Sequence, residues 1–453
     1  MRIRLIQPPL VQPLWRQLTI PVIGAEFEAQ GMAVEVCDEN IDELDESDVD
    51  VVGITCHVYN ANRAFEISEK FRKRHIPVIF GGTFPTVSPQ LVAEHADSVV
   101  VGELEGLIAE IVSDLRAGNL KPLYEHKNRP SLEQTVKPDF SLLKNDSYFK
   151  FTFPLETSRG CRFNCKFCTT NALYGKPRCR SLSDIERDIS QYDHGLIEVI
   201  DVNFLNDSSH FKKVLPLLKA SSAPGWTGQT TLSDLAAAPE LPRLFAASRC
   251  RSLFIGLETP SETSLSELNK SWSNPKELRQ VVSAFHKEGV LVQAGIIVGL
   301  DSDNKESFKE MIEFLQSTGV HAISLTFLHY YPGTQAYELV EKEGRIASTS
   351  WAELDGDFPV IVPKNLTIAA LKSEVTKLTN QLFSFSAITS RAYRAGLFRH
   401  FSQLVHHFTI NLSLRDYYQE LQSRSAGVRN KANAFAKIST DLVAFMLSFL
   451  WSW

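Results

Sequence analysis

Short apolar runs alternate with helical patterns over most of this chain, and no other feature limits its fold as much. In the first 120 residues the apolar runs have the length of buried strands, and they lie at residues 3–7, 34–37, 51–55, 78–80 and 98–101. Helical spacing separates them, as at 60–73, where Ala64, Ile67 and Phe71 recur on one face. This order predicts a doubly wound α/β domain, in which helices cover both faces of a parallel sheet.

The alternation resumes after a stretch rich in proline and charge. The second set of apolar runs predicts six strands, at residues 154–157, 198–202, 228–231, 252–257, 291–298 and 322–328. Helical patterns follow or separate them, as at 305–318, which predicts a partial (β/α)6 barrel with its active face at the carboxyl ends of the strands. We therefore expect an N-terminal doubly wound domain at 1–120, a linker at 121–150, the barrel at 151–350 and a mainly helical region at 351–453.

Composition narrows the class of protein. Of the 453 residues, 43% are apolar and 22% are charged, which is typical of a soluble globular protein. The net charge of −6 gives no electrostatic reason to bind nucleic acid. The N-terminus lacks the pattern of a secretory signal, and the seven cysteines are an odd number. These features favour a reducing cytoplasm and metal binding over disulfides.

The strongest chemical signal follows the first predicted barrel strand. Cys161, Cys165 and Cys168 have the spacing Cys-x3-Cys-x2-Cys, which lets three thiolates hold one soft metal centre. A closed zinc site with Cys179 as fourth ligand is the alternative, whereas three ligands alone leave an open position for catalysis. Three basic residues beside the thiolates would help stabilise a negatively charged cluster: Arg159, Arg162 and Lys166.

Glycines mark the loops at the carboxyl ends of two N-terminal strands. Gly81-Gly82 follows the predicted strand 78–80, and Gly102 follows 98–101. Glycine allows the backbone to approach a flat or phosphate-bearing ligand closely. The alternative is that these glycines only turn the chain.

The cysteine triplet, with an aromatic residue just before its last cysteine, resembles the radical S-adenosylmethionine (radical SAM) superfamily. Further motifs follow in the family's order, including Asp-Val-Asn-Phe at 201–204 and Gly-Ile-Ile-Val-Gly-Leu-Asp at 295–301. The resemblance implies a four-iron four-sulfur (4Fe-4S) cluster on the three cysteines, whose open iron binds S-adenosylmethionine (SAM). It also implies a set of SAM contacts: Phe167, Asp201, Asn203, Gln229, Glu258 and Ile297.

Residues 61–64, 80–85 and 95–103 resemble the cobalamin-binding domain that precedes the barrel in one branch of this superfamily. The resemblance implies a set of corrin contacts: Tyr59, Gly81, Gly82, Thr83, Phe84, Gly102 and Glu103. The Asp-x-His-x-x-Gly signature of an axial histidine is absent. We interpret His57 as a loop or packing residue, with axial ligation as the alternative.

Members of that branch are often methyltransferases that act on unactivated carbon. The resemblance therefore implies cobalamin-dependent methyl transfer to a small-molecule or lipid substrate, with electrons from a flavodoxin- or ferredoxin-type donor. Two alternatives are a radical SAM enzyme that transfers another part of SAM, such as an aminocarboxypropyl group, and a non-enzymatic metal-binding protein. The apolar residues 442–453 are too few to span a bilayer, and we expect them to form a helix that packs on protein or lies at a membrane surface.

Overall fold

A computed structural model describes residues 1–10, 15–148, 150–399 and 401–423. The predicted terminal helix at 442–453 lies outside the described residues. The chain divides into two compact units. The first consists of Met1–Gln229, His329–Gly344 and Ser348–Asp355, and the second of Thr230–Leu328, Arg345–Ala347 and Gly356–Trp453.

The first unit contains the predicted N-terminal sheet. Its strands are β1 (Arg2–Gln7), β2 (Ala33–Asp38), β3 (Val51–Thr55), β4 (Val78–Gly81), β5 (Ser98–Val101) and β6 (Leu123–Glu125). They are parallel and pair in the order β2-β1-β3-β4-β5-β6. The order reverses direction after β2, so the carboxyl ends of β1 and β3 flank the switch point at which ligands of such sheets bind.

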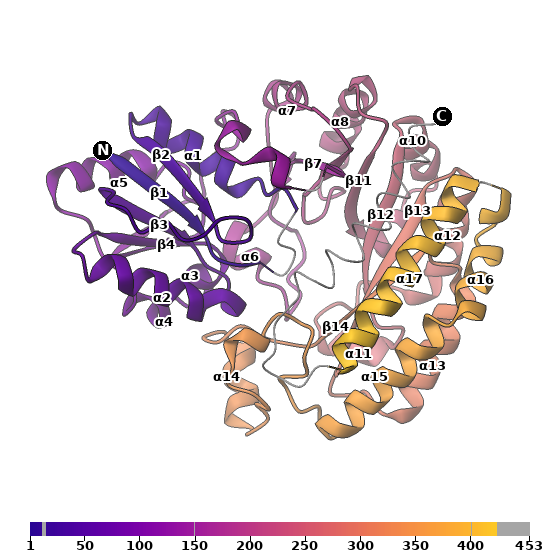
Figure 1. Ribbon diagram of the computed structural model, residues 1–453. Helices are drawn as coiled ribbons and strands as arrows, with labels where there is room; N and C mark the ends of the chain where they lie inside the picture. The colour runs from indigo at the N-terminus through magenta and orange to yellow at the C-terminus, as the bar shows by residue number, and fades with distance from the viewer. Residues whose placement is uncertain (11–14, 149, 400, 424–453) are drawn as a thin grey trace. The chain divides into compact units, whose positions relative to one another are not determined.

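Helices cover both faces of this sheet, as predicted (Figure 1). In the figure α1 (Thr19–Ala29) and α5 (Ile108–Ala117) lie on one face, and α2 (Ala61–Arg72), α3 (Thr83–Val87) and α4 (Pro89–Ala93) lie on the other. The predicted apolar spacing of α2 is the reason it packs there, since Ala64, Ile67 and Phe71 are all buried.

The second sheet is the predicted partial barrel. Its strands are β7 (Thr152–Leu155), β10 (Leu196–Val199), β11 (Trp226–Thr231), β12 (Cys250–Glu258), β13 (Leu291–Val298) and β14 (Ala322–Phe327). They pair in the order β14-β13-β12-β11-β10-β7, and the registers of β7, β10 and β11 and of β12, β13 and β14 are parallel. Six strands in sequential order that do not close on themselves form an open barrel, which confirms the predicted fold class.

Helices separate these strands. They are α6 (Thr170–Tyr174), α7 (Leu182–Ile189), α8 (Ser208–Ala220), α9 (Leu232–Ala236), α10 (Leu241–Ala247), α11 (Glu262–Glu267), α12 (Leu278–Lys287), α13 (Lys305–Thr318) and α14 (Gln335–Lys342). The predicted helix at 305–318 has the bounds of α13, because Asn304 caps its first turn and Gly319 ends it with a left-handed backbone.

The C-terminal region is helical, as predicted, over its described part. It consists of α15 (Ile368–Leu382), α16 (Phe385–Arg394) and α17 (Phe401–Ser423), which lie beside α12 and α13 in the second unit (Figure 1). Within the described residues, no helix is both long and apolar enough to cross a membrane.

Three short strands were not predicted. Residues 123–125, within the expected linker, form the edge strand β6. Residues 158–159 (β8) and 178–179 (β9) form an antiparallel pair that frames the cysteine loop. Strands of two or three residues carry too little periodicity to be detected in a sequence.

Candidate functional site

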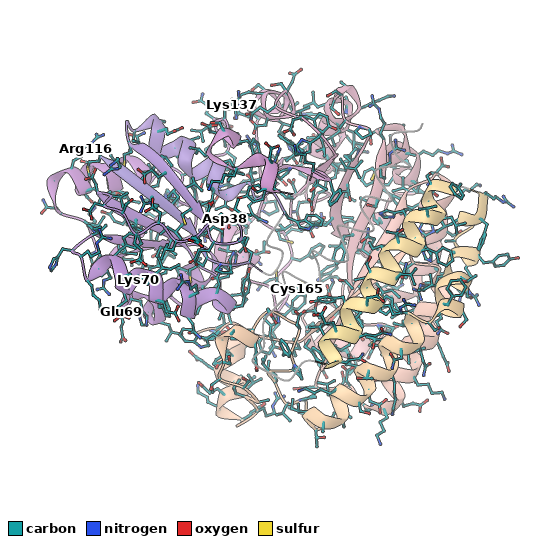
Figure 2. The ribbon with its side chains drawn as sticks, viewed as in Figure 1. Asp38, Glu69, Lys70, Arg116, Lys137 and Cys165 are labelled. Carbon is teal, nitrogen blue, oxygen red and sulfur yellow. The ribbon has the colours of Figure 1, made fainter. Side chains whose placement is uncertain are left out.

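The three predicted cluster cysteines lie on one loop between β8 and α6. Gly160 begins this loop with φ of +87°, and a β-carbon there would lie 2.7 Å from the Gly175 carbonyl oxygen. The loop closes where the Cys161 amide donates to that same oxygen at 3.2 Å and the Cys168 amide donates to the Cys165 carbonyl at 3.1 Å. Cys161 and Cys165 are half-buried and Cys168 is exposed, so none of the three is fully enclosed by protein; Figure 2 labels Cys165.

Side chains that follow β10 hold the cysteine loop in place. Asn206 donates to the Gly160 carbonyl at 2.9 Å and accepts from the Arg162 amide at 3.3 Å. Asp201 is buried and accepts three hydrogen bonds at 2.6–2.7 Å, from the Thr157 amide and from the hydroxyls of Thr157 and Ser158. Burial raises the pKa of Asp201 to about 6, although these hydrogen bonds oppose the shift.

The remaining predicted SAM contacts of the first unit lie near the same edge. Asn203 is fully buried and its side-chain oxygen accepts from the Leu205 amide at 3.2 Å, while the Gln229 carbonyl accepts from the Phe204 amide at 3.0 Å. Phe167 is half-buried on the cysteine loop. In this arrangement Asp201 and Asn203 make structural hydrogen bonds, and their contact with SAM stays a prediction.

The second unit holds the other two predicted SAM contacts. Glu258 ends β12 with φ of +65°, and its carboxylate accepts from the Lys270 ammonium at 2.6 Å. Lys270 is itself buried and also donates to the Gly256 carbonyl at 2.7 Å. This pair fixes the rotamer of Glu258 at the end of its strand. Ile297 lies next to the last residue of β13 and is 7% exposed.

The cysteine loop has the donor set of a 4Fe-4S cluster. Thiolates are the usual ligands of such clusters, and each binds a separate iron, so the three sulfurs need not converge on one point. Among the described residues, no three His, Cys, Asp or Glu side chains converge as they would around a single ion. Cys179, the fourth ligand of the zinc alternative, is a half-buried residue of β9, and burial raises the pKa of its thiol to about 11. The residues therefore fit the cluster.

The predicted corrin loops have glycines where side chains would interfere. Gly82 has φ of +109°, and a β-carbon there would lie 2.9 Å from the Cys56 carbonyl oxygen. Gly81 differs, because no described heavy atom lies within 4 Å of its hypothetical β-carbon. Gly102 has φ of +85°, and its amide donates to Thr86 at 2.9 Å. The open space at Gly81 fits the approach of a flat ligand, whereas a β-carbon at Gly102 would meet the Arg129 side chain.

The aromatic residues of these loops differ in exposure. Tyr59 is half-buried and stacks on His57, with ring centroids 5.3 Å apart and planes 4° apart. Burial lowers the pKa of His57 to about 4, and its side chain caps the short helix η1 (Val58–Asn60), which agrees with its interpretation as a loop residue. Phe84 is fully buried and packs edge-on against Trp351 at 5.1 Å, while Thr83 begins α3 and is half-buried.

Glu103 belongs to a buried network of ion pairs. Its carboxylate pairs with Arg159 at 2.8 Å and with Arg178 at 2.5 Å. Arg159 also pairs with Glu105 at 2.6 Å and with Glu156 at 2.9 Å. Three carboxylates therefore pair with Arg159, and its role in offsetting the charge of a cluster stays a prediction. The exposed Arg162 and Lys166 still fit that role.

Sequence reasoning missed several residues that build these sites. They are Glu105, Glu156, Arg178, Asn206 and Lys270. Glu105 lies two residues after Glu103 and could have been recognised from that spacing. Arg178 and Glu103 are 75 residues apart, and such pairs leave no local pattern in a sequence.

Comparisons with known proteins agree with this arrangement. The family model of the radical SAM superfamily matches residues 155–315, and that of the B12 binding domain matches residues 12–112. Bacteriochlorophyllide d C-12(1)-methyltransferase of Chlorobaculum tepidum is 28% identical over 356 residues, which are 77% of this chain and 77% of that protein. Hopanoid C-2 methylase of Rhodopseudomonas palustris is 24% identical over 78% of this chain and 69% of its own length.

Solved structures show the same fold. The radical S-adenosylmethionine methyltransferase TsrM of Kitasatospora setae, solved with cobalamin and a 4Fe-4S cluster bound, has a TM-score of 0.63 to this chain. The likeness covers 97% of this chain and 99% of that one, at 16% sequence identity. The two matched domains account for the three cofactors that the sequence predicts: a 4Fe-4S cluster, SAM and cobalamin. The chain thus carries a B12-binding domain followed by a radical SAM domain, as the sequence resemblance predicts.

Proposed function

We propose that this enzyme transfers a methyl group from SAM to an unactivated carbon, in a reaction that depends on cobalamin. The observation that supports this most directly lies within the first unit, where a three-cysteine loop and glycine-built loops at the ends of β4 and β5 belong to one body. When bound, the cluster and SAM would supply radical chemistry and cobalamin would supply methyl transfer. The protein must hold the cofactors, orient the substrate and exclude water.

The chain's own residues divide these tasks. Cys161, Cys165 and Cys168 hold the cluster and leave one iron for SAM. We propose that Glu258, whose carboxylate pairs with Lys270 at 2.6 Å, accepts a hydrogen bond from the amine or ribose of SAM, and that the Ile297 backbone contacts adenine. Gly81, Gly82 and Gly102 let a corrin approach the backbone.

The substrate we propose is a large apolar small molecule or lipid. Two relatives are named for polycyclic substrates, a bacteriochlorophyllide and a hopanoid. A flavodoxin- or ferredoxin-type protein of the cytoplasm would supply the electrons, since the odd number of cysteines favours a reducing compartment. Contact of residues 442–453 with a membrane surface would suit a lipid substrate. Co-sedimentation with anionic vesicles, compared between the full chain and a chain lacking these residues, tests that contact.

The experiment is spectroscopic and chemical. Protein purified without oxygen and reconstituted with iron, sulfide and hydroxocobalamin should show the broad absorbance of the cluster together with corrin bands. After reduction it should convert SAM to 5′-deoxyadenosine and S-adenosylhomocysteine. Protein that holds the cluster and cleaves SAM but cannot bind cobalamin would contradict the proposal and favour the aminocarboxypropyl alternative.

A further inference from the structure

We propose that Glu103 and Arg159 form a positioning link that couples the corrin loop to the cluster loop, so that occupation of one cofactor site changes the other. This inference rests on the cofactor set of the proposed function. Glu103 follows Gly102 in the B12-binding domain, and Arg159 lies two residues before Cys161 in the radical SAM domain. Both residues belong to the first unit.

The link is short and desolvated. The side chain of Glu103 is 2% exposed and that of Arg159 is 9% exposed, and their nitrogen and oxygen atoms are 2.8 Å apart. A charged pair removed from water is held far more firmly than one at the surface, because a carboxylate that loses its partner there has no solvent to replace it. Movement of the Glu103 backbone must therefore carry the Arg159 guanidinium with it or break the pair.

Additional contacts make the link stiff on both sides. The guanidinium of Arg159 uses its remaining nitrogens on Glu105 and Glu156, which is the fork geometry that arginine alone provides. On the other side, Arg178 joins Glu103 to the Tyr174 carbonyl at 3.0 Å, at the end of the helix that follows the cysteines. The carboxylate of Glu103 thus touches both ends of the segment that carries Cys161, Cys165 and Cys168.

The cluster loop has little freedom to absorb such a movement. Gly160 connects Arg159 to Cys161, and its hypothetical β-carbon would lie 2.7 Å from the Gly175 carbonyl oxygen, which shows how closely the backbone is packed. The Gly160 carbonyl is also fixed by Asn206. Arg159, Gly160 and Cys161 are consecutive in the chain, so a shift at Arg159 reaches the first cluster ligand through Gly160. This is a contiguous physical path between the sites.

A purely structural role is the alternative, since buried ion pairs also occur away from sites. The chain offers a matched control of that kind. Arg180 and Asp188 form a pair at 2.6 Å whose side chains are 3% and 5% exposed. The Arg180 side chain also donates to the Thr135 hydroxyl and the Glu156 carbonyl, which lie outside the loop at 102–105. If burial alone mattered, disruption of either pair would have the same consequences.

The test probes the link from both sides, because a coupling between two sites must be detectable at each of them. Arg159→Lys keeps the charge but loses the fork. It should weaken hydroxocobalamin binding about tenfold in an absorbance titration of the reconstituted protein, within the range typical of coupled sites. Glu103→Gln should alter the electron paramagnetic resonance spectrum of the reduced cluster in corrin-free protein and weaken SAM binding at least fivefold. Asp188→Asn should change each dissociation constant less than about twofold.

The outcomes separate this inference from the proposed function. Wild-type protein that binds no hydroxocobalamin contradicts the proposed function itself. If the wild type binds hydroxocobalamin and Arg159→Lys binds it equally well at full iron content, the link alone is overturned. If Arg159→Lys fails to hold the cluster, the test of the coupling rests on Glu103→Gln, because that substitution lies in the other domain. An unchanged cluster spectrum and unchanged SAM affinity in Glu103→Gln would then contradict the coupling.

Discussion

Two regions of this molecule bury polar groups in opposite ways. In the first unit, the network around Arg159 buries charges and pairs each of them with an opposite charge. In the second unit, His321 is fully buried, and its ring contacts those of His406 at 2.7 Å and His407 at 3.3 Å. Arg391 is a charged residue beside these rings, and it donates to Asn411 at 2.7 Å.

The difference shows what decides the charge state of a buried group. Burial lowers the pKa of His286 and of His407 to about 4 and that of His321 well below its ordinary value, so the rings are neutral at pH 7. Some carboxylates of the first unit are buried as deeply as these histidines. The arginines beside Glu105 nevertheless hold the pKa of its carboxyl below its usual range. Carboxylates near the cofactor loops thus keep their charge, whereas the histidines buried where α16 and α17 pack on the barrel are neutral beside the buried Arg391.

The largest expected difference between the two regions is the effect of replacing their cysteines. Replacement of Cys161, Cys165 or Cys168 by Ala should remove the cluster absorbance and all cleavage of SAM, because each thiolate binds one iron. Cys250 of β12 is fully buried in the second unit, and burial raises the pKa of its thiol well above the usual value. Cys250→Ala should therefore keep both properties, as should Cys37→Ala. Anaerobic absorbance spectra and product analysis measure this difference. SAM cleavage in a variant that lacks Cys161, Cys165 or Cys168 would contradict the prediction.

Gly81 offers a sharper test of the corrin loop than Gly82. A side chain at Gly82 would be strained by its backbone whether or not a ligand binds, whereas the space at Gly81 is open. Gly81→Trp should fold and keep the cluster but lose hydroxocobalamin binding by at least about a hundredfold, while Gly81→Ala should retain most of it. The dissociation constants are measured by absorbance titration. Unimpaired corrin binding in Gly81→Trp would place the corrin elsewhere.

The histidines of the second unit predict an acid transition. A ring whose folded pKa is below its unfolded value of 6.5 binds fewer protons when folded, so stability is present above pH 6.5 and falls as pH drops toward 4. The shifts of His286 and His407 correspond to at most about 3 kcal/mol each. His321, His406 and the charge of Arg391 face the same cluster and oppose protonation further. Thermal unfolding between pH 7.5 and 4.5 measures this.

The matched variant identifies the source of that transition. His407→Gln removes one titrating ring and should flatten the fall in unfolding temperature. A pH profile identical to that of the wild type would show that the transition arises elsewhere in the chain.

Loss of a helix cap should destabilise the two regions equally. This is the smallest expected effect, and it serves as a control. Asp207 caps α8 in the first unit through the amides of Ser209 and His210, and Asn304 caps α13 in the second through the amides of Glu306 and Ser307. Replacement of either cap by Ala should cost about 1 kcal/mol of unfolding free energy at pH 7. A much larger loss in one of them, measured by denaturant unfolding, would mean that the regions differ in general rigidity and not only in buried charge.

The sequence could predict the features that depend on local pattern. The strand at 98–101 and the helix at 305–318 have the predicted bounds, because apolar periodicity and end signals lie within the elements themselves. The three cysteines were found from spacing alone. The partners of Arg159 and of Glu258 could not be found in this way, since Glu103 and Lys270 reach them only after the chain has folded. The same limit explains why the three carboxylates that pair with Arg159 could not be predicted from the basic residues beside the cysteines.

The most direct test of the central claim is the fate of SAM in the reduced, reconstituted, cobalamin-loaded protein, followed by chromatography. Methyl transfer breaks the bond between sulfur and the methyl carbon and leaves S-adenosylhomocysteine, whereas aminocarboxypropyl transfer leaves 5′-methylthioadenosine. The account predicts S-adenosylhomocysteine that appears only when cobalamin is bound, and none in Cys165→Ala. Formation of 5′-methylthioadenosine as the main product, at a rate that does not depend on cobalamin, would contradict it.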